Sequence, residues 1–101
     1  MTLTSPRVVI VTGASSGIGL AIAAAFLKRG DRVVGNARNA ERLQQAAASL
    51  GTHADNFLSI AGDVADPATG VRLVQGAIER FGRVDVLVNN AGIFNAKPFV
   101  G

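Results

Sequence analysis

The chain has 101 residues, of which 49% are hydrophobic and 17% charged, so we expect a single domain (1–101) with a modest core and exclude a disordered chain. The net charge is +3, but the basic residues are scattered and tryptophan and tyrosine are absent, so we expect no nucleic-acid interface. Cysteine is absent and no apolar run reaches the length of a membrane span; we therefore expect no disulfide, no metal site, no membrane contact and a cytoplasmic location.

Four short apolar runs are expected to form strands. The first, 8–11, is apolar and β-branched at every position, which is typical of a strand covered on both faces. The second spans 32–37 and the third 57–61. The fourth spans 84–88 and is interrupted only by Asp85, which we interpret as a structural hydrogen-bonding residue rather than a catalyst.

The segments between these runs have the features of helices. The first, 20–29, is rich in alanine and is followed by Gly30, a favourable C-terminal residue. Asn39 can cap the second helix. Asp66 and Pro67 can open the third. Helical spacing places the apolar residues of this third segment on one face: Val71, Val74, Ile78 and Phe81.

The alternation of strands and helices decides the fold class. The order β-α-β-α-β-α-β predicts parallel strands joined by right-handed crossovers. We therefore expect an α/β protein with an open parallel sheet.

A glycine-rich segment, 12–19, directly follows the first strand and opens the first helix. In this segment Gly13 would make the turn, Gly17 would allow close approach of a ligand, and Gly19 would let the helix pack on the strand. Free N–H groups at a helix start favour an anion, and the strand–loop–helix context is the one that a phosphate-binding motif requires. The alternative is that the glycines only build a turn.

Three motifs together resemble one family. The spacing Thr-Gly-x-x-x-Gly-Ile-Gly in 12–19 is similar to the signature of the short-chain dehydrogenase/reductase family. Asp63-Val64 resembles its adenine-pocket pair, and the segment 89–92 resembles its Asn-Asn-Ala-Gly motif. The resemblance implies a Rossmann-like fold and an oxidoreductase that transfers hydride between a nicotinamide cofactor and an alcohol or carbonyl substrate.

The resemblance also implies which residues contact the cofactor. The serines and isoleucine of the loop would line the pyrophosphate and adenosine ribose. Asp63 would accept from the adenine amino group while Val64 packs on the ring, and Asn90 would lie beside the ribose and brace the central strands. Asp63 could instead cap a turn, and Asn89 could be a turn former. The implied set is Gly13, Ser15, Ser16, Gly17, Ile18, Gly19, Asp63, Val64, Asn90, Ala91 and Gly92.

The end of the second strand bears on the choice of cofactor. An NAD enzyme carries an acidic residue there to hold the ribose 2′-hydroxyl. This chain has Ala37 at that position, followed by Arg38. A guanidinium suits a 2′-phosphate through its bidentate fork, so we expect NADP in preference to NAD. The alternative is that Arg38 is only solvated.

The family's chemistry requires a Tyr-x-x-x-Lys pair and a serine that follow the Asn-Asn-Ala-Gly motif. This chain contains no tyrosine, and Lys97 therefore has no such partner. We expect no catalytic residues here, a truncated domain and a chain that is catalytically incompetent alone. Two other functions stay open: a nucleotide-binding module without catalysis, and a self-assembling structural half-domain.

Truncation would leave surfaces uncovered. In the expected strand order 3-2-1-4, the fourth strand is an open edge. The first two helices would share one face of the sheet, and the third would lie alone on the other. An exposed apolar edge can pair with another chain, so we expect a homo-oligomer through the fourth strand.

Overall fold

The computed structural model describes residues 6–90. The elements are β1 (Val8–Thr12), α1 (Gly17–Lys28), β2 (Arg32–Ala37), α2 (Ala40–Ser49), the short 3-10 helix η1 (Gly51–Asn56), β3 (Phe57–Ala61), α3 (Pro67–Phe81) and β4 (Val86–Val88). The strands are parallel and lie in the order β3-β2-β1-β4. This confirms the expected α/β class and strand order.

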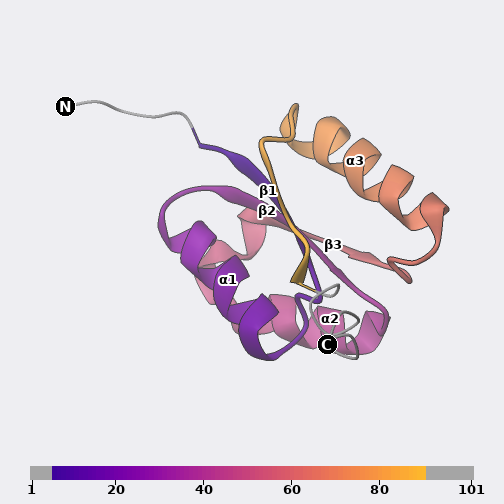
Figure 1. Ribbon diagram of the computed structural model, residues 1–101. Coiled ribbons are helices and arrows are strands. Elements are labelled where there is room, and N and C mark those ends of the chain that lie inside the picture. Colours follow the sequence, from indigo (N-terminus) through magenta and orange to yellow (C-terminus); the bar gives the residue numbers. More distant parts are fainter. Residues whose placement is uncertain (1–5, 91–101) are drawn as a thin grey trace, which may run out of the picture.

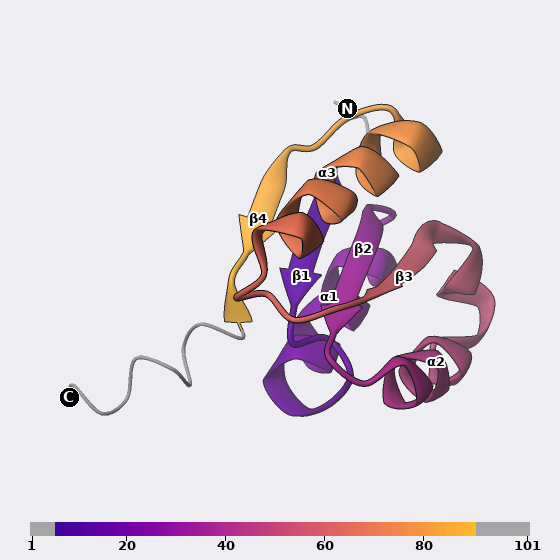
Figure 2. The same ribbon diagram turned by 90° about the vertical axis from the view of Figure 1, so that its right-hand side faces the viewer.

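The sheet is covered on both faces. Helices α1 and α2 lie on one face and α3 lies on the other (Figures 1 and 2). Val9 and Val11 of β1 pack with the first pair of helices, and Val8 and Ile10 pack with α3. Every residue of β1 is buried, which explains why its sequence is apolar at successive positions rather than alternating.

Local signals place most element ends. The Asn39 side chain caps α2 by accepting the backbone N–H of Arg42. Asp66 caps α3 in the same way through the N–H of Ala68, and α3 ends at Gly82, whose φ of 88° is left-handed. Helix α1 begins at residue 17, earlier than the expected start at residue 20, because the last residues of the glycine-rich segment form its first turn.

Helix α3 buries a different face from the apolar stripe seen in the sequence. Its buried residues are Thr69, Leu73 and Ala77, which are spaced at i, i+4 and i+8. Of the stripe seen in the sequence, Val71, Val74 and Ile78 are exposed by 54%, 45% and 53%, respectively. Its fourth member, Phe81, is partly buried and packs against the core that contains Leu73 and Ala77. The helix carries two apolar stripes, and the sheet covers only the one formed by Leu73 and Ala77.

The fourth strand is shorter than expected. It begins at Val86 rather than at residue 84, and its three residues pair with Val9–Val11 of β1. It forms the edge of the sheet (Figure 2). Residue Leu87 pairs with Ile10 and so lies on the α3 face, where it is 63% exposed.

No helix between residues 6 and 90 combines the length and the apolar character needed to cross a bilayer. The cytoplasmic location stays a prediction.

Candidate functional site

A pocket of about 420 Å³ opens at the carboxyl ends of the strands. Nine of the residues singled out in the sequence line it: Gly13, Ser15, Ser16, Gly17, Ile18, Arg38, Asp63, Val64 and Asn90. Four others join them, namely Asn36, Ala37, Asn39 and Arg42. The fold thus gathers segments from the ends of all four strands around one cavity. Gly19 lies in the loop but not on the wall, and Ala91 and Gly92 lie outside the described residues.

The glycine-rich loop has the backbone that its sequence requires. Gly13 and Gly17 have φ values of 64° and 57°, a left-handed conformation that favours glycine. A Cβ on Gly19 would collide with the carbonyl oxygen of Gly13, so the loop can fold back on α1 only because residue 19 has no side chain. Ser16 stands at the N-cap of α1 but makes no side-chain capping bond. The N–H groups of the first turn are therefore left for another acceptor.

Asn90 joins the loop to the end of β4. Its side chain is buried, with 2% exposed, and Nδ2 donates to the carbonyl oxygen of Gly13 over 3.2 Å. Its Oδ1 is buried and has no hydrogen-bond partner among the described residues. A buried acceptor without a donor costs about 1–3 kcal/mol. Because Asn90 lines the pocket, a ligand hydroxyl group bound there would remove that cost.

Asn36 is a pocket residue that the sequence reasoning missed. It is buried near the end of β2, and its Nδ2 donates to the carbonyl oxygens of Ile60 at 3.0 Å and Gly62 at 3.1 Å. The backbone carbonyl oxygen of Asn36 accepts the backbone N–H of Ala14 over 2.8 Å. Asn36 thus ties the glycine-rich loop to the end of β3. The available signal was a lone polar residue inside an apolar strand.

Two arginines line the pocket beside the end of β2. Arg38 directly follows the strand, and Arg42 lies in the first turn of α2. Both side chains are exposed, and neither forms an ion pair with a carboxylate among residues 6–90. Ala37, the last residue of β2, leaves this position without the carboxylate of an NAD site. The sequence reasoning found Arg38 and missed Arg42.

Asp63 fits both of its interpretations. Its Oδ1 accepts the N–H of Ala65 over 2.9 Å, which is the turn-capping role. The same residue also lines the pocket beside Val64. Its contact with an adenine group stays a prediction.

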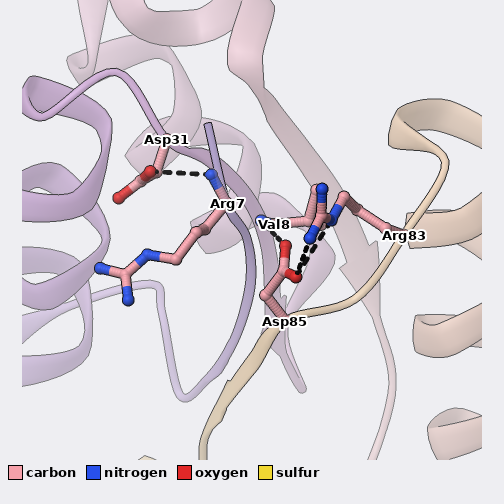
Figure 3. Close-up of polar contacts among 5 residues, drawn as sticks. All are labelled: Arg7, Val8, Asp31, Arg83 and Asp85. Atoms are coloured by element: carbon pink, nitrogen blue, oxygen red, sulfur yellow. Dashed lines mark hydrogen bonds and ion pairs between the residues drawn. The ribbon is translucent and has the colours of Figure 1, made fainter. Parts of the chain in front are cut away.

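Two further aspartates lie at the opposite end of β1 (Figure 3). Asp85 accepts the N–H of Val8 over 2.8 Å and two hydrogen bonds from Arg83. The Val8 hydrogen bond, followed by that from Arg83, lowers the pKa of the Asp85 carboxyl below its ordinary value. Asp31 accepts the N–H of Arg7 over 2.9 Å on the other side of the strand. These bonds hold the start of β1 and confirm that Asp85 is structural.

Known proteins resemble the chain in sequence and in structure. A profile of the short chain dehydrogenase family matches residues 7–100. The 2-(R)-hydroxypropyl-CoM dehydrogenase of Xanthobacter autotrophicus is 51% identical over 88 residues, which are 86% of this chain and 35% of that protein. The D-threitol dehydrogenase of Mycolicibacterium smegmatis is 41% identical over 92 residues, which are 91% of this chain and 35% of that protein.

The structural comparison agrees with the sequence comparison. The L-sorbose reductase of Gluconobacter frateurii, solved in complex with NADPH and L-sorbose, superposes with a TM-score of 0.79 at 46% identity. The match covers 87% of this chain and 34% of that one. The chain spans about a third of the length of each of these three proteins. Because the family profile covers nearly all of its residues, the chain belongs to the short-chain dehydrogenase family.

Proposed function

We propose that this chain binds NADP(H) and forms the cofactor-binding part of an oxidoreductase that transfers hydride between the nicotinamide and an alcohol or carbonyl substrate. The observation that carries the proposal is the composition of the pocket. Its wall combines an uncapped helix start with a guanidinium and has no carboxylate at the end of β2. The helix start and the guanidinium both favour a ligand with phosphate groups.

Each part of the pocket wall has a proposed role in binding the cofactor. The glycine-rich loop and the first turn of α1 would hold the pyrophosphate through backbone N–H groups. Arg38 would bind the 2′-phosphate. Asp63 and Val64 would contact the adenine, and Asn90 would offer its orphaned Oδ1 to a ribose hydroxyl. Ala91 and Gly92 belong to the same proposed site but lie outside the described residues.

A related protein supports the choice of cofactor. The L-sorbose reductase of Gluconobacter frateurii, 46% identical to this chain, was solved with NADPH. When bound, the cofactor would supply the hydride. The residues described here would bind and orient it.

We further propose that this chain alone carries out no hydride transfer. The sequence contains no tyrosine, and the family resemblance assigns proton transfer to a tyrosine. A reductase assay on the isolated chain tests this, and turnover above that of a buffer blank would contradict it. Nucleotide binding without turnover would favour a binding module, and neither property would favour a structural half-domain.

We also propose self-association through β4. This edge strand exposes Leu87 by 63%, and the exposed stripe of α3 lies on the same face of the sheet. An unpaired edge beside apolar surface can pair with a second copy. Light scattering in dilute buffer tests this proposal, and a monomer at all concentrations would refute it.

The first experiment on cofactor binding is a calorimetric titration of the full chain with NADPH and, separately, with NADH. The proposal expects NADPH to bind more tightly than NADH. If neither nucleotide binds, the cofactor-binding role is wrong. If NADH binds as tightly as NADPH, the role holds but the assigned preference is wrong.

A further inference from the structure

We infer that Arg42 acts with Arg38 as a two-armed clamp for the 2′-phosphate and that Arg42 is a second determinant of cofactor specificity. This inference rests on the proposed NADP(H)-binding function. It adds a residue from α2 to a role that the sequence assigned to Arg38 alone.

The position of Arg42 is fixed by the cap of α2. Only Arg38 and Asn39 separate β2 from the helix. The Asn39 Oδ1 accepts the backbone N–H of Arg42 over 2.9 Å, which holds the first helical turn against the end of the strand. Both arginines line the same pocket. The short link therefore places two arginines at the wall of one cavity.

Neither guanidinium group forms an ion pair with an acidic side chain in the described part of the chain. All seven acidic residues of the sequence lie within the described range, and the ion pairs found there join Arg29 with Asp31 and Arg83 with Asp85. Glu41, the neighbour of Arg42, does not line the pocket. Asp63 also lines the pocket but forms no ion pair with either arginine within residues 6–90, so the two arginines leave the wall with net positive charge.

Helix physics gives no reason for an arginine at this position. The start of a helix carries partial positive charge, so a cation in the first turn is unfavourable unless an anion lies nearby. The Arg42 side chain makes no hydrogen bond within residues 6–90 that would offset this. Residues that are unfavourable for local structure and make no stabilising contact are expected mainly at functional sites.

The charge of the ligand requires two cations. A phosphomonoester such as the 2′-phosphate carries about −1.5 to −2 charges near pH 7. One guanidinium compensates only one charge and binds the phosphate through one bidentate pair of hydrogen bonds. Arg38 and Arg42 together match the charge of the group, whereas a 2′-hydroxyl gains little from either.

The test is a calorimetric titration of Arg38→Gln, Arg42→Gln and the double variant with NADPH and with NADH. We expect each single variant to lose about tenfold to a hundredfold in NADPH affinity and to keep its NADH affinity within about twofold. The double variant should bind the two nucleotides about equally. Arg42→Lys should recover part of the loss because it restores the charge without the fork.

Three controls separate the clamp from general effects on charge, nicotinamide binding and folding. Lys28→Gln removes the same charge from the exposed last turn of α1, at the far end of the helix from the pocket, and should leave both affinities unchanged. The probe 2′,5′-ADP carries the phosphate without the nicotinamide and should show the same loss as NADPH. Thermal unfolding of Arg42→Gln should occur at or slightly above the temperature of the parent chain, because the side chain makes no bond within the described fold and its charge opposes the helix dipole.

The outcomes distinguish the clamp from the proposed function. If the parent chain prefers NADPH and Arg42→Gln leaves that preference intact, the clamp is wrong and the proposed function stands. If Arg42→Gln weakens NADPH and NADH equally, Arg42 acts on a group shared by both, and the clamp is again wrong. If the parent chain binds no nucleotide, both the proposed function and the clamp are wrong.

Discussion

The two ends of the sheet differ in how their polar side chains are paired. At the amino end of β1 these side chains bind other groups of the protein, whereas at the carboxyl ends of the strands some face a pocket without forming a hydrogen bond or an ion pair. Asp31 and Asp85 accept the backbone N–H groups of Arg7 and Val8. The second oxygen of Asp31 has no hydrogen bond, but it forms an ion pair with Arg29 at 3.7 Å. At the other end, and within the described residues, the buried Oδ1 of Asn90 has no hydrogen-bond partner. Arg38 and Arg42 form no ion pair with a carboxylate there. Paired polar groups hold the fold together, and unpaired ones beside a cavity indicate where a ligand binds.

The largest expected effect on NADPH binding comes from a substitution that fills the space between the glycine-rich loop and α1. In Gly19→Val the new Cβ would meet the carbonyl oxygen of Gly13, which must move and take the loop with it. We expect NADPH binding to fall below detection and the free energy of unfolding to drop by about 1–3 kcal/mol. Gly70→Ala, where the added Cβ meets open space, is the control for calorimetry and thermal unfolding. Parent-like binding by Gly19→Val would contradict the loop's role.

A negative charge at the end of β2 should change the preference of the pocket. Ala37→Asp places a carboxylate where an NAD site carries one. We expect NADPH affinity to fall by about tenfold to a hundredfold while NADH affinity rises. Ala25→Asp adds the same charge on the exposed side of α1 and should change neither affinity. A parallel loss for both nucleotides in Ala37→Asp would indicate damage to the pocket instead of a change in selectivity.

A substitution at the amino end should alter stability without altering binding. Because folding lowers the pKa of Asp85, its stabilising contribution is complete above the unfolded value of about 3.9 and is lost as the pH falls through the lower folded value. Asp85→Asn should therefore lower the melting temperature at pH 7 and have less effect near pH 3. NADPH affinity at pH 7 should stay unchanged.

Asp55→Asn, on the exposed surface, is the control because it removes the same charge. Melting temperatures across pH 3–7 provide the measurement. An equal destabilisation of Asp85→Asn at every pH would show that the charge of Asp85 contributes nothing.

The smallest effect on the folded chain is expected at the edge of the sheet. Leu87→Lys places a charge on a mostly exposed side chain, so the free energy of unfolding should change by less than about 0.5 kcal/mol. The same change should convert the proposed oligomer to a monomer in light scattering. Gln44→Lys, on exposed α2 across the sheet, should leave the assembly intact. If Leu87→Lys still associates, the contact lies elsewhere.

The local signals in the sequence predicted most of the fold. The order of strands and helices and the caps at Asn39 and Asp66 depend on neighbouring residues, and each is present in the structure. The glycine-rich loop was also visible, because the left-handed backbone at Gly13 and Gly17 requires a residue type that a sequence records directly.

The sequence by itself determined the fold class and the loop, because these follow from local spacing and conformation. The tertiary structure decided which stripe of α3 is buried, since a helix with two apolar stripes needs the sheet to choose between them. It also decided that Asn36 bonds to Ile60 and Gly62, and that Arg42 lines the pocket. These contacts join residues from different elements, so their existence depends on how β2, α2 and β3 are placed in space.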